Sequence, residues 1–93
     1  MDLQNKVTII TGGSGGLGMA AAKAFLAKGA KVAVFDLEEG GAKALAKENA
    51  GQLKYYKTNV TREDNVAANI NQVVEDFGSI DVCINCAGFG PSA

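Results

Sequence analysis

Four short apolar runs alternate with three amphipathic stretches along this chain of 93 residues. Three of the runs contain Val or Ile, the run at 53–58 contains Leu and two Tyr, and we read all four as too apolar to have one face in water, which indicates strands buried inside a sheet. The stretches between them place apolar residues at three- and four-residue spacing, which is typical of helices packed on one side. We therefore predict strands at residues 6–10, 31–36, 53–58 and 81–85, and helices at 17–28, 41–49 and 61–77.

This alternation predicts an α/β fold of the Rossmann type, a doubly wound parallel sheet of four strands with three helices on its two faces. Crossovers between parallel strands are right-handed. If the first three strands step one way and the fourth returns beside the first, the strand order is 3-2-1-4. A ligand is then expected at the carboxyl ends of the strands, where the order reverses between strands one and four.

Local signals predict how two of the helices begin and end. Gly29 and Gly78 stand where left-handed helix caps are needed, and Thr61 with Asp64 three residues later forms a variant of the capping box. The apolar faces are expected on two sets of residues. They are Leu17, Ala20, Ala21, Ala24 and Phe25 in the first helix, and Val66, Ile70, Val73, Val74 and Phe77 in the third.

The composition excludes several classes of protein. Nine basic residues balance ten acidic ones, there is no His, and 47% of the chain is apolar, so nothing predicts a nucleic-acid or anionic-membrane partner. The amino terminus lacks the pattern of a signal peptide, and no stretch is long enough to cross a bilayer. We therefore expect a cytoplasmic protein, or an organellar one from which a targeting segment has been removed.

A glycine-rich segment at residues 11–18 joins the first predicted strand to the first helix. Backbone amides and the helix dipole there point at whatever lies above the sheet, and glycines let a pyrophosphate approach the main chain. The segment therefore predicts a dinucleotide site, the alternative being a flexible loop without a ligand. A mononucleotide P-loop is disfavoured because Met19 and Ala20 follow Gly18, where Lys-Ser or Lys-Thr is required.

Asp36 ends the second predicted strand, eighteen positions after Gly18. A carboxylate at this place can accept hydrogen bonds from the hydroxyls of an adenosine ribose, and it repels a 2′-phosphate. Neither Leu37 nor Gly15 supplies the positive charge that such a phosphate needs. The pattern therefore favours NAD over NADP, the alternative being an ordinary solvated acid at the end of a strand.

Cys83 and Cys86 are spaced as in a redox or zinc motif, but neither site is expected. Residues three apart on a strand point to opposite faces, so the two thiols diverge. Zinc would need further ligands, and the chain has no other Cys and no His. We expect two buried cysteines that act as small apolar residues, and no metal site.

Four motifs in order resemble the short-chain dehydrogenase/reductase superfamily, and most of all its type II 3-hydroxyacyl-CoA dehydrogenase branch. They span the chain and read Thr11-Gly12-x-x-x-Gly16-x-Gly18, Asp36, Asn59-Val60 and Asn85-Cys86-Ala87-Gly88. Two positions depart from the usual family pattern, which has Asp in place of Asn59 and Asn in place of Cys86. An amide oxygen at position 59 can still accept a hydrogen bond from an exocyclic amine.

The resemblance implies NAD as the cofactor and a set of residues that bind it. Asp36 would hold the adenine ribose, Asn59 would face the adenine amino group beside the backbone of Val60, and residues 87–88 would lie near the second ribose. The glycines and Leu17 would line the pyrophosphate. The predicted cofactor-binding residues are Gly12, Ser14, Gly15, Gly16, Leu17, Gly18, Asp36, Leu37, Asn59, Val60, Cys86, Ala87 and Gly88.

No catalytic residue is predicted within these 93 residues. The family chemistry implies a Ser and a Tyr-x-x-x-Lys, whereas Tyr55 and Tyr56 are followed four residues later by Asn59 and Val60 and are expected to be packing or rim residues. Residues 1–93 are therefore predicted to be the NAD-binding half of a longer oxidoreductase that interconverts a secondary alcohol, for example a 3-hydroxyacyl-CoA, and a ketone.

Two other functions stay open. One is a module or structural domain that binds NAD or an adenine nucleotide without turnover, and the other is an interaction domain with a vestigial glycine loop. In either case, a four-stranded sheet of this order leaves the fourth strand without an outer neighbour. We therefore expect self-association, or docking against the rest of a parent subunit.

Overall fold

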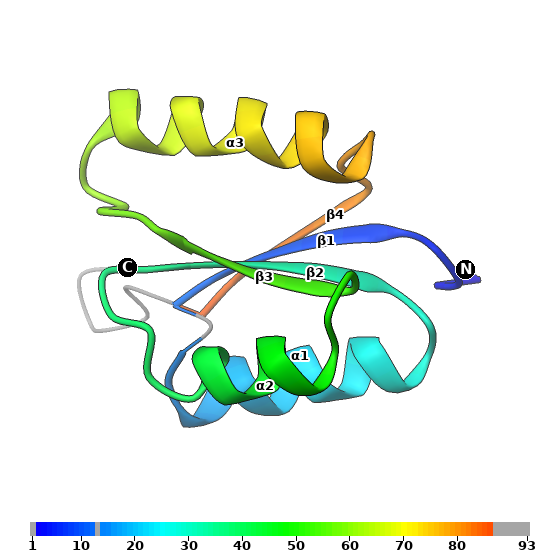
Figure 1. Ribbon diagram of the computed structural model, residues 1–93. Coiled ribbons are helices and arrows are strands. Elements are labelled where there is room, and N and C mark those ends of the chain that lie inside the picture. Colours follow the sequence, from blue (N-terminus) through cyan, green and yellow to red (C-terminus); the bar gives the residue numbers. More distant parts are fainter. Residues whose placement is uncertain (1, 13, 87–93) are drawn as a thin grey trace.

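A computed structural model describes residues 2–12 and 14–86 of the chain. Strands and helices alternate as predicted, with ends that differ by one or two residues from the expected ones (Figure 1). The elements are β1 (Val7–Thr11), α1 (Gly16–Ala27), β2 (Lys31–Asp36), α2 (Ala42–Glu48), β3 (Leu53–Lys57), α3 (Glu63–Phe77) and β4 (Val82–Asn85).

The four strands form one parallel sheet in the order β3-β2-β1-β4, which confirms the predicted topology. In the register of the sheet, Thr11 at the end of β1 lies beside Phe35 of β2 and Asn85 of β4. Asp36 at the end of β2 lies beside Lys57 of β3. All four strands therefore deliver their carboxyl ends to one edge of the sheet, and the candidate site is built there.

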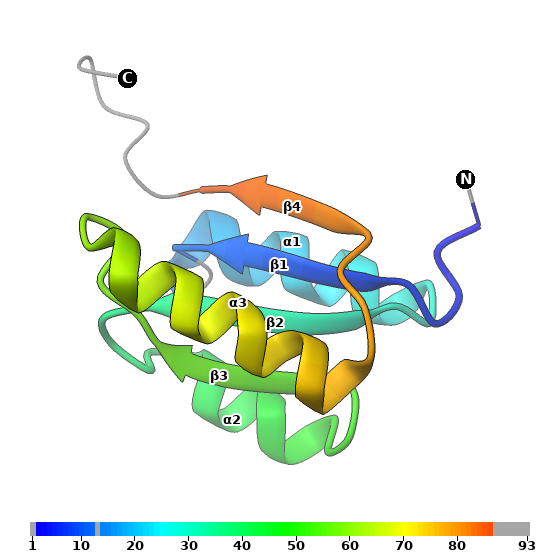
Figure 2. The same cartoon turned by 90° about the horizontal axis from the view of Figure 1, so that it is seen from above.

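Helices cover the two faces of the sheet unequally. Figure 1 shows α1 and α2 on one face and α3 alone on the other. The side chains of β1 and β2 are buried on both faces, as predicted, because these are the two middle strands. The prediction that no strand has a wet face is wrong for β3 and β4, whose residues are partly exposed. Both are edge strands, and Figure 2 shows β4 beside α3 rather than beneath it.

The buried face of α1 matches the predicted one only in part, since Ala21 and Phe25 pack against the core. Leu17, Ala20 and Ala24 are exposed, whereas Gly18 and Ala22 are buried against the sheet. Apolar spacing is a poor guide in this helix, because apolar or small residues occur on nearly all of its sides. Gly18 has no side chain and so permits close packing of helix on strand, which selects the buried face instead.

The N-cap of α3 lies one residue later than the capping box predicts. Arg62, not Thr61, occupies the N-cap position, and no side chain caps the helix. The Thr61 hydroxyl instead donates to the side-chain oxygen of Asn59, 2.6 Å away. The helix ends at Gly78, which has φ 94°, as predicted. In the part of the chain that the structure describes, no helix combines the length and apolarity needed to cross a membrane.

Candidate functional site

The turn after β1 begins at Gly12, which has φ 71° and therefore a backbone that favours glycine. Its N–H donates to the carbonyl of Phe35, 2.7 Å away, so the loop is held against the end of β2. α1 then starts at Gly16 with Gly15 as its N-cap, and it has neither a side-chain cap nor an acidic residue in its first turn. The first amides of α1 therefore form a site suited to an anion.

The Asp36 carboxylate is held by that same loop. Its Oδ2 accepts hydrogen bonds from the Ser14 hydroxyl at 2.6 Å and from the Ser14 N–H at 3.3 Å. Within residues 2–12 and 14–86, Oδ1 accepts one long hydrogen bond, of 3.4 Å, from the N–H of Glu38. Burial raises the pKa of Asp36, but the hydrogen bonds from Ser14 and from the backbone outweigh it and hold this pKa below its ordinary value. The carboxylate is therefore ionised at neutral pH.

A cleft of about 190 Å³ opens beside Asp36 at the carboxyl ends of β1, β2 and β3. Five of its lining residues are predicted cofactor-binding residues that come from three separate loops. Three further lining residues were not predicted, and each is next to a predicted residue in the sequence. The cleft is lined by Gly12, Asp36, Leu37, Asn59 and Val60 together with Phe35, Thr58 and Thr61.

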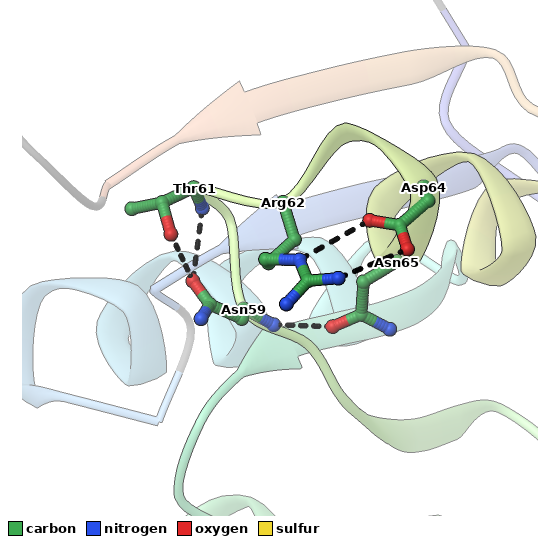
Figure 3. A network of polar contacts seen from close by, with 5 residues as sticks. All are labelled: Asn59, Thr61, Arg62, Asp64 and Asn65. Carbon is green, nitrogen blue, oxygen red and sulfur yellow. Dashed lines mark hydrogen bonds and ion pairs between the residues drawn. The ribbon is translucent and has the colours of Figure 1, made fainter.

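Asn59 organises the turn that closes this cleft (Figure 3). Its side-chain oxygen accepts hydrogen bonds from both the N–H and the hydroxyl of Thr61, at 3.0 and 2.6 Å, and its own N–H donates to Asn65. A carbonyl oxygen has two lone pairs, so this oxygen is fully used. The expected acceptance of an adenine amine by the Asn59 oxygen therefore does not fit this arrangement, whereas the side-chain NH2 can still donate.

The remaining predicted residues lie around the start of α1 and beyond β4. The Leu17 side chain is 66% exposed at the first turn of the helix, and Gly18 is buried. Cys86 is half-buried and packs against the cluster of apolar residues beneath α1 and α2. Ala87 and Gly88 lie outside the described residues.

The cysteines and tyrosines do not line the cleft beside Asp36. Both cysteines are free thiols, but the prediction that both are buried is wrong, because Cys83 is exposed and Cys86 is only half-buried. Figure 2 shows that α3 does not reach across β4. The Tyr55 hydroxyl donates to the carbonyl of Asp36, and Tyr56 is buried with its hydroxyl bonded to Asp76. Burial and this bond raise the pKa of Tyr56, which makes it a weak proton donor. Among the described residues, no three metal-ligating side chains come together.

Residues 6–93 match the family model described as short chain dehydrogenase. Among curated relatives, the 3-hydroxyacyl-CoA dehydrogenase type-2 of Rattus norvegicus is 39% identical over 82 residues, which are 88% of this chain and 31% of the relative.

Two solved structures resemble the fold closely. A putative D-mannonate oxidoreductase from Haemophilus influenza with bound NAD has a TM-score of 0.79 and 38% identity over 88% of this chain and 30% of its own. A 3-ketoacyl-(acyl-carrier-protein) reductase from Brucella melitensis complexed with NADH has a TM-score of 0.80 and 32% identity over 87% of this chain and 34% of its own. The chain spans about a third of the length of these relatives. Since the family model covers nearly all of it, the chain belongs to the short-chain dehydrogenase family.

Proposed function

We propose that this chain is the NAD-binding part of an oxidoreductase. The observation that carries the proposal is the cleft beside Asp36, because an ionised carboxylate, the Gly12 turn and the Asn59–Val60 segment meet there at the carboxyl edge of a parallel sheet. The two solved relatives carry NAD or NADH, which supports the same cofactor here.

The residues around the start of α1 fit a dinucleotide. Beyond its chain neighbours and the backbone of its own helix, a Cβ built at Gly16 would meet no described atom within 4 Å, so a ligand can approach the main chain there. The uncapped amides of that turn would donate to the pyrophosphate, with Leu17 beside it. When bound, the nicotinamide cofactor supplies the hydride chemistry. This chain would bind and orient the adenosine and pyrophosphate portions.

Asp36 makes NAD the favoured form. Among the described residues, Glu38 alone donates to its Oδ1, over a long bond, so Oδ1 can accept from a ribose hydroxyl, while a 2′-phosphate would face a negative charge. At the other end of the cleft, the Asn59 NH2 would donate to a ring nitrogen of adenine, because its oxygen is occupied by Thr61.

For the complete protein we propose the interconversion of a secondary alcohol and a ketone by hydride transfer. The similar relatives include a 3-hydroxyacyl-CoA dehydrogenase and a putative D-mannonate oxidoreductase at nearly equal identity. A 3-hydroxyacyl-CoA is therefore one substrate to test, and a sugar acid is the other. Full-length protein should reduce NAD with one of them.

A second candidate function is binding of NAD or an adenine nucleotide without turnover. It is supported by the Tyr56–Asp76 hydrogen bond, which engages the buried tyrosine. The 93-residue chain alone should therefore form no NADH from an alcohol. Absorbance at the NADH wavelength above a buffer blank, with purity checked by mass spectrometry, would contradict this expectation.

Titration of the chain with NAD, followed by amide NMR shifts, tests the binding proposal. We expect shifts at residues 12–18, 36–37 and 59–61. Amides near Lys54 and Asp76 should stay unchanged, because they border a different cleft at the opposite edge of the sheet. Absent shifts at millimolar NAD, or shifts confined to that second cleft, would refute the proposal.

The outer edge of β4 supports a further proposal, that the chain self-associates or docks against the rest of a longer subunit. Among the described residues β4 pairs only with β1, and Cys83 on its surface is exposed. Sedimentation over a concentration series should show association that Cys83→Lys weakens and Ala24→Lys, a control on the exposed side of α1, does not. A monomer throughout the micromolar range would contradict self-association.

A further inference from the structure

The glycine loop and the turn after β2 hold Asp36 from two sides. Ser14 uses both its hydroxyl and its N–H on one carboxylate oxygen, Oδ2, at 2.6 and 3.3 Å. This oxygen therefore has its two lone pairs occupied by a single neighbour. The other oxygen, Oδ1, keeps capacity for a ligand, because the one hydrogen bond it accepts from the residues that the structure describes is 3.4 Å long.

Gly40 keeps Ser14 in that position. It has φ 48°, and a Cβ built on it would lie 2.8 Å from the Ser14 carbonyl oxygen and 2.9 Å from the Ser14 Cβ. The turn after β2 therefore packs directly against Ser14, at a distance that only glycine permits. Backbone from one loop and backbone from the other enclose the Ser14 side chain, which points at Asp36.

We propose that Ser14 is a positioning residue that determines cofactor specificity by locking the Asp36 carboxylate, so that Oδ1 faces the ribose hydroxyls. Ser14 acts through Asp36 and need not touch the cofactor. This inference rests on the proposed NAD-binding function. With the carboxylate locked, a 2′-phosphate meets a negative charge that cannot rotate away; with Ser14 removed, the carboxylate can turn aside and the repulsion weakens.

A double-mutant cycle on cofactor preference tests this mechanism. Ser14→Ala should lower the ratio of NAD affinity to NADP affinity by about tenfold, the effect of losing one hydrogen bond to a charged group. In an Asp36→Ala background the same substitution should leave the ratio of NAD affinity to NADP affinity unchanged, because no carboxylate remains for Ser14 to hold. Ser79→Ala is the matched control, since the Ser79 hydroxyl also donates to a carboxylate, that of Asp81, but lies away from the cleft.

A measurement without cofactor separates this inference from the proposed function. Carboxyl carbon NMR should show the Asp36 pKa rising in Ser14→Ala and staying constant in Ser79→Ala. Ser14→Gly, which also lacks the hydroxyl, repeats the test if the alanine variant does not fold. An unmoved pKa, or equal effects of Ser14→Ala with and without Asp36, would overturn the inference. If no variant binds NAD but the pKa moves, the lock stands and the proposed function fails.

Discussion

Two buried threonines of this chain should respond to the same substitution with opposite signs. Thr8 in the middle of β1 is fully buried between Val32 and Val82, and its hydroxyl has no hydrogen-bond partner among the described residues. Thr58 is buried to the same degree, but its hydroxyl donates to the Tyr56 carbonyl at 2.8 Å and accepts from the Asn69 amide at 2.7 Å. Valine has the same shape as threonine without the hydroxyl.

The size of each effect follows from these contacts. A buried hydroxyl without a partner costs about 1–3 kcal/mol, so Thr8→Val should raise the free energy of unfolding by roughly that amount. Thr58→Val should lower it by about 1–3 kcal/mol, because the Asn69 amide loses its acceptor. Urea unfolding measures both. With a slope of about 1–2 kcal/mol per molar urea, the two midpoints should move about 1 M in opposite directions.

The slope of the urea transition provides the control, since it should stay equal in the wild-type chain and both variants if only stability changes. A destabilised Thr8→Val chain would show that the Thr8 hydroxyl does have a partner in solution. If both substitutions changed the free energy of unfolding in the same direction, the hydrogen bonding of the buried hydroxyls would not explain their effects, and both predictions would be refuted.

Three further outcomes are expected. Asp36→Ala should reduce NAD affinity by about ten- to a hundredfold, from the loss of a charge-assisted hydrogen bond, and should raise NADP affinity, as calorimetry at one salt concentration can show. Gly40→Ala should destabilise the chain and weaken NAD binding, because the added Cβ meets Ser14. Gly51 also has a positive φ but lies in open space, so Gly51→Ala should lower the free energy of unfolding only through backbone strain and should leave NAD binding intact. Asp81 accepts from a backbone N–H of β1, which lowers the pKa of its carboxyl. Its stabilising effect is therefore present above about pH 4 and lost as the pH falls further, so the urea midpoint should decrease in that range. Asp81→Asn should make this decrease smaller.

Much of the fold could be predicted because it depends on local patterns. Apolar runs such as residues 31–36 can only be strands covered on both faces, and the right-handed crossover then restricts the order of parallel strands. The positions of Gly12 and Asp36 could be predicted for the same reason. Gly12 needs a left-handed backbone, and Asp36 ends a strand. Each is determined by its neighbours along the chain.

What only the tertiary structure decided are the contacts between loops that are distant in sequence. Ser14 meets Asp36 across 22 positions, and the Tyr55 hydroxyl donates to the Asp36 carbonyl across 19. The exposure of Cys83 likewise depends on how far α3 reaches across the sheet. Periodicity and motif spacing specify which residues arrive at the carboxyl edge of the sheet. They do not specify which polar atoms pair there, because pairing depends on distances of a few tenths of an ångström that packing alone determines.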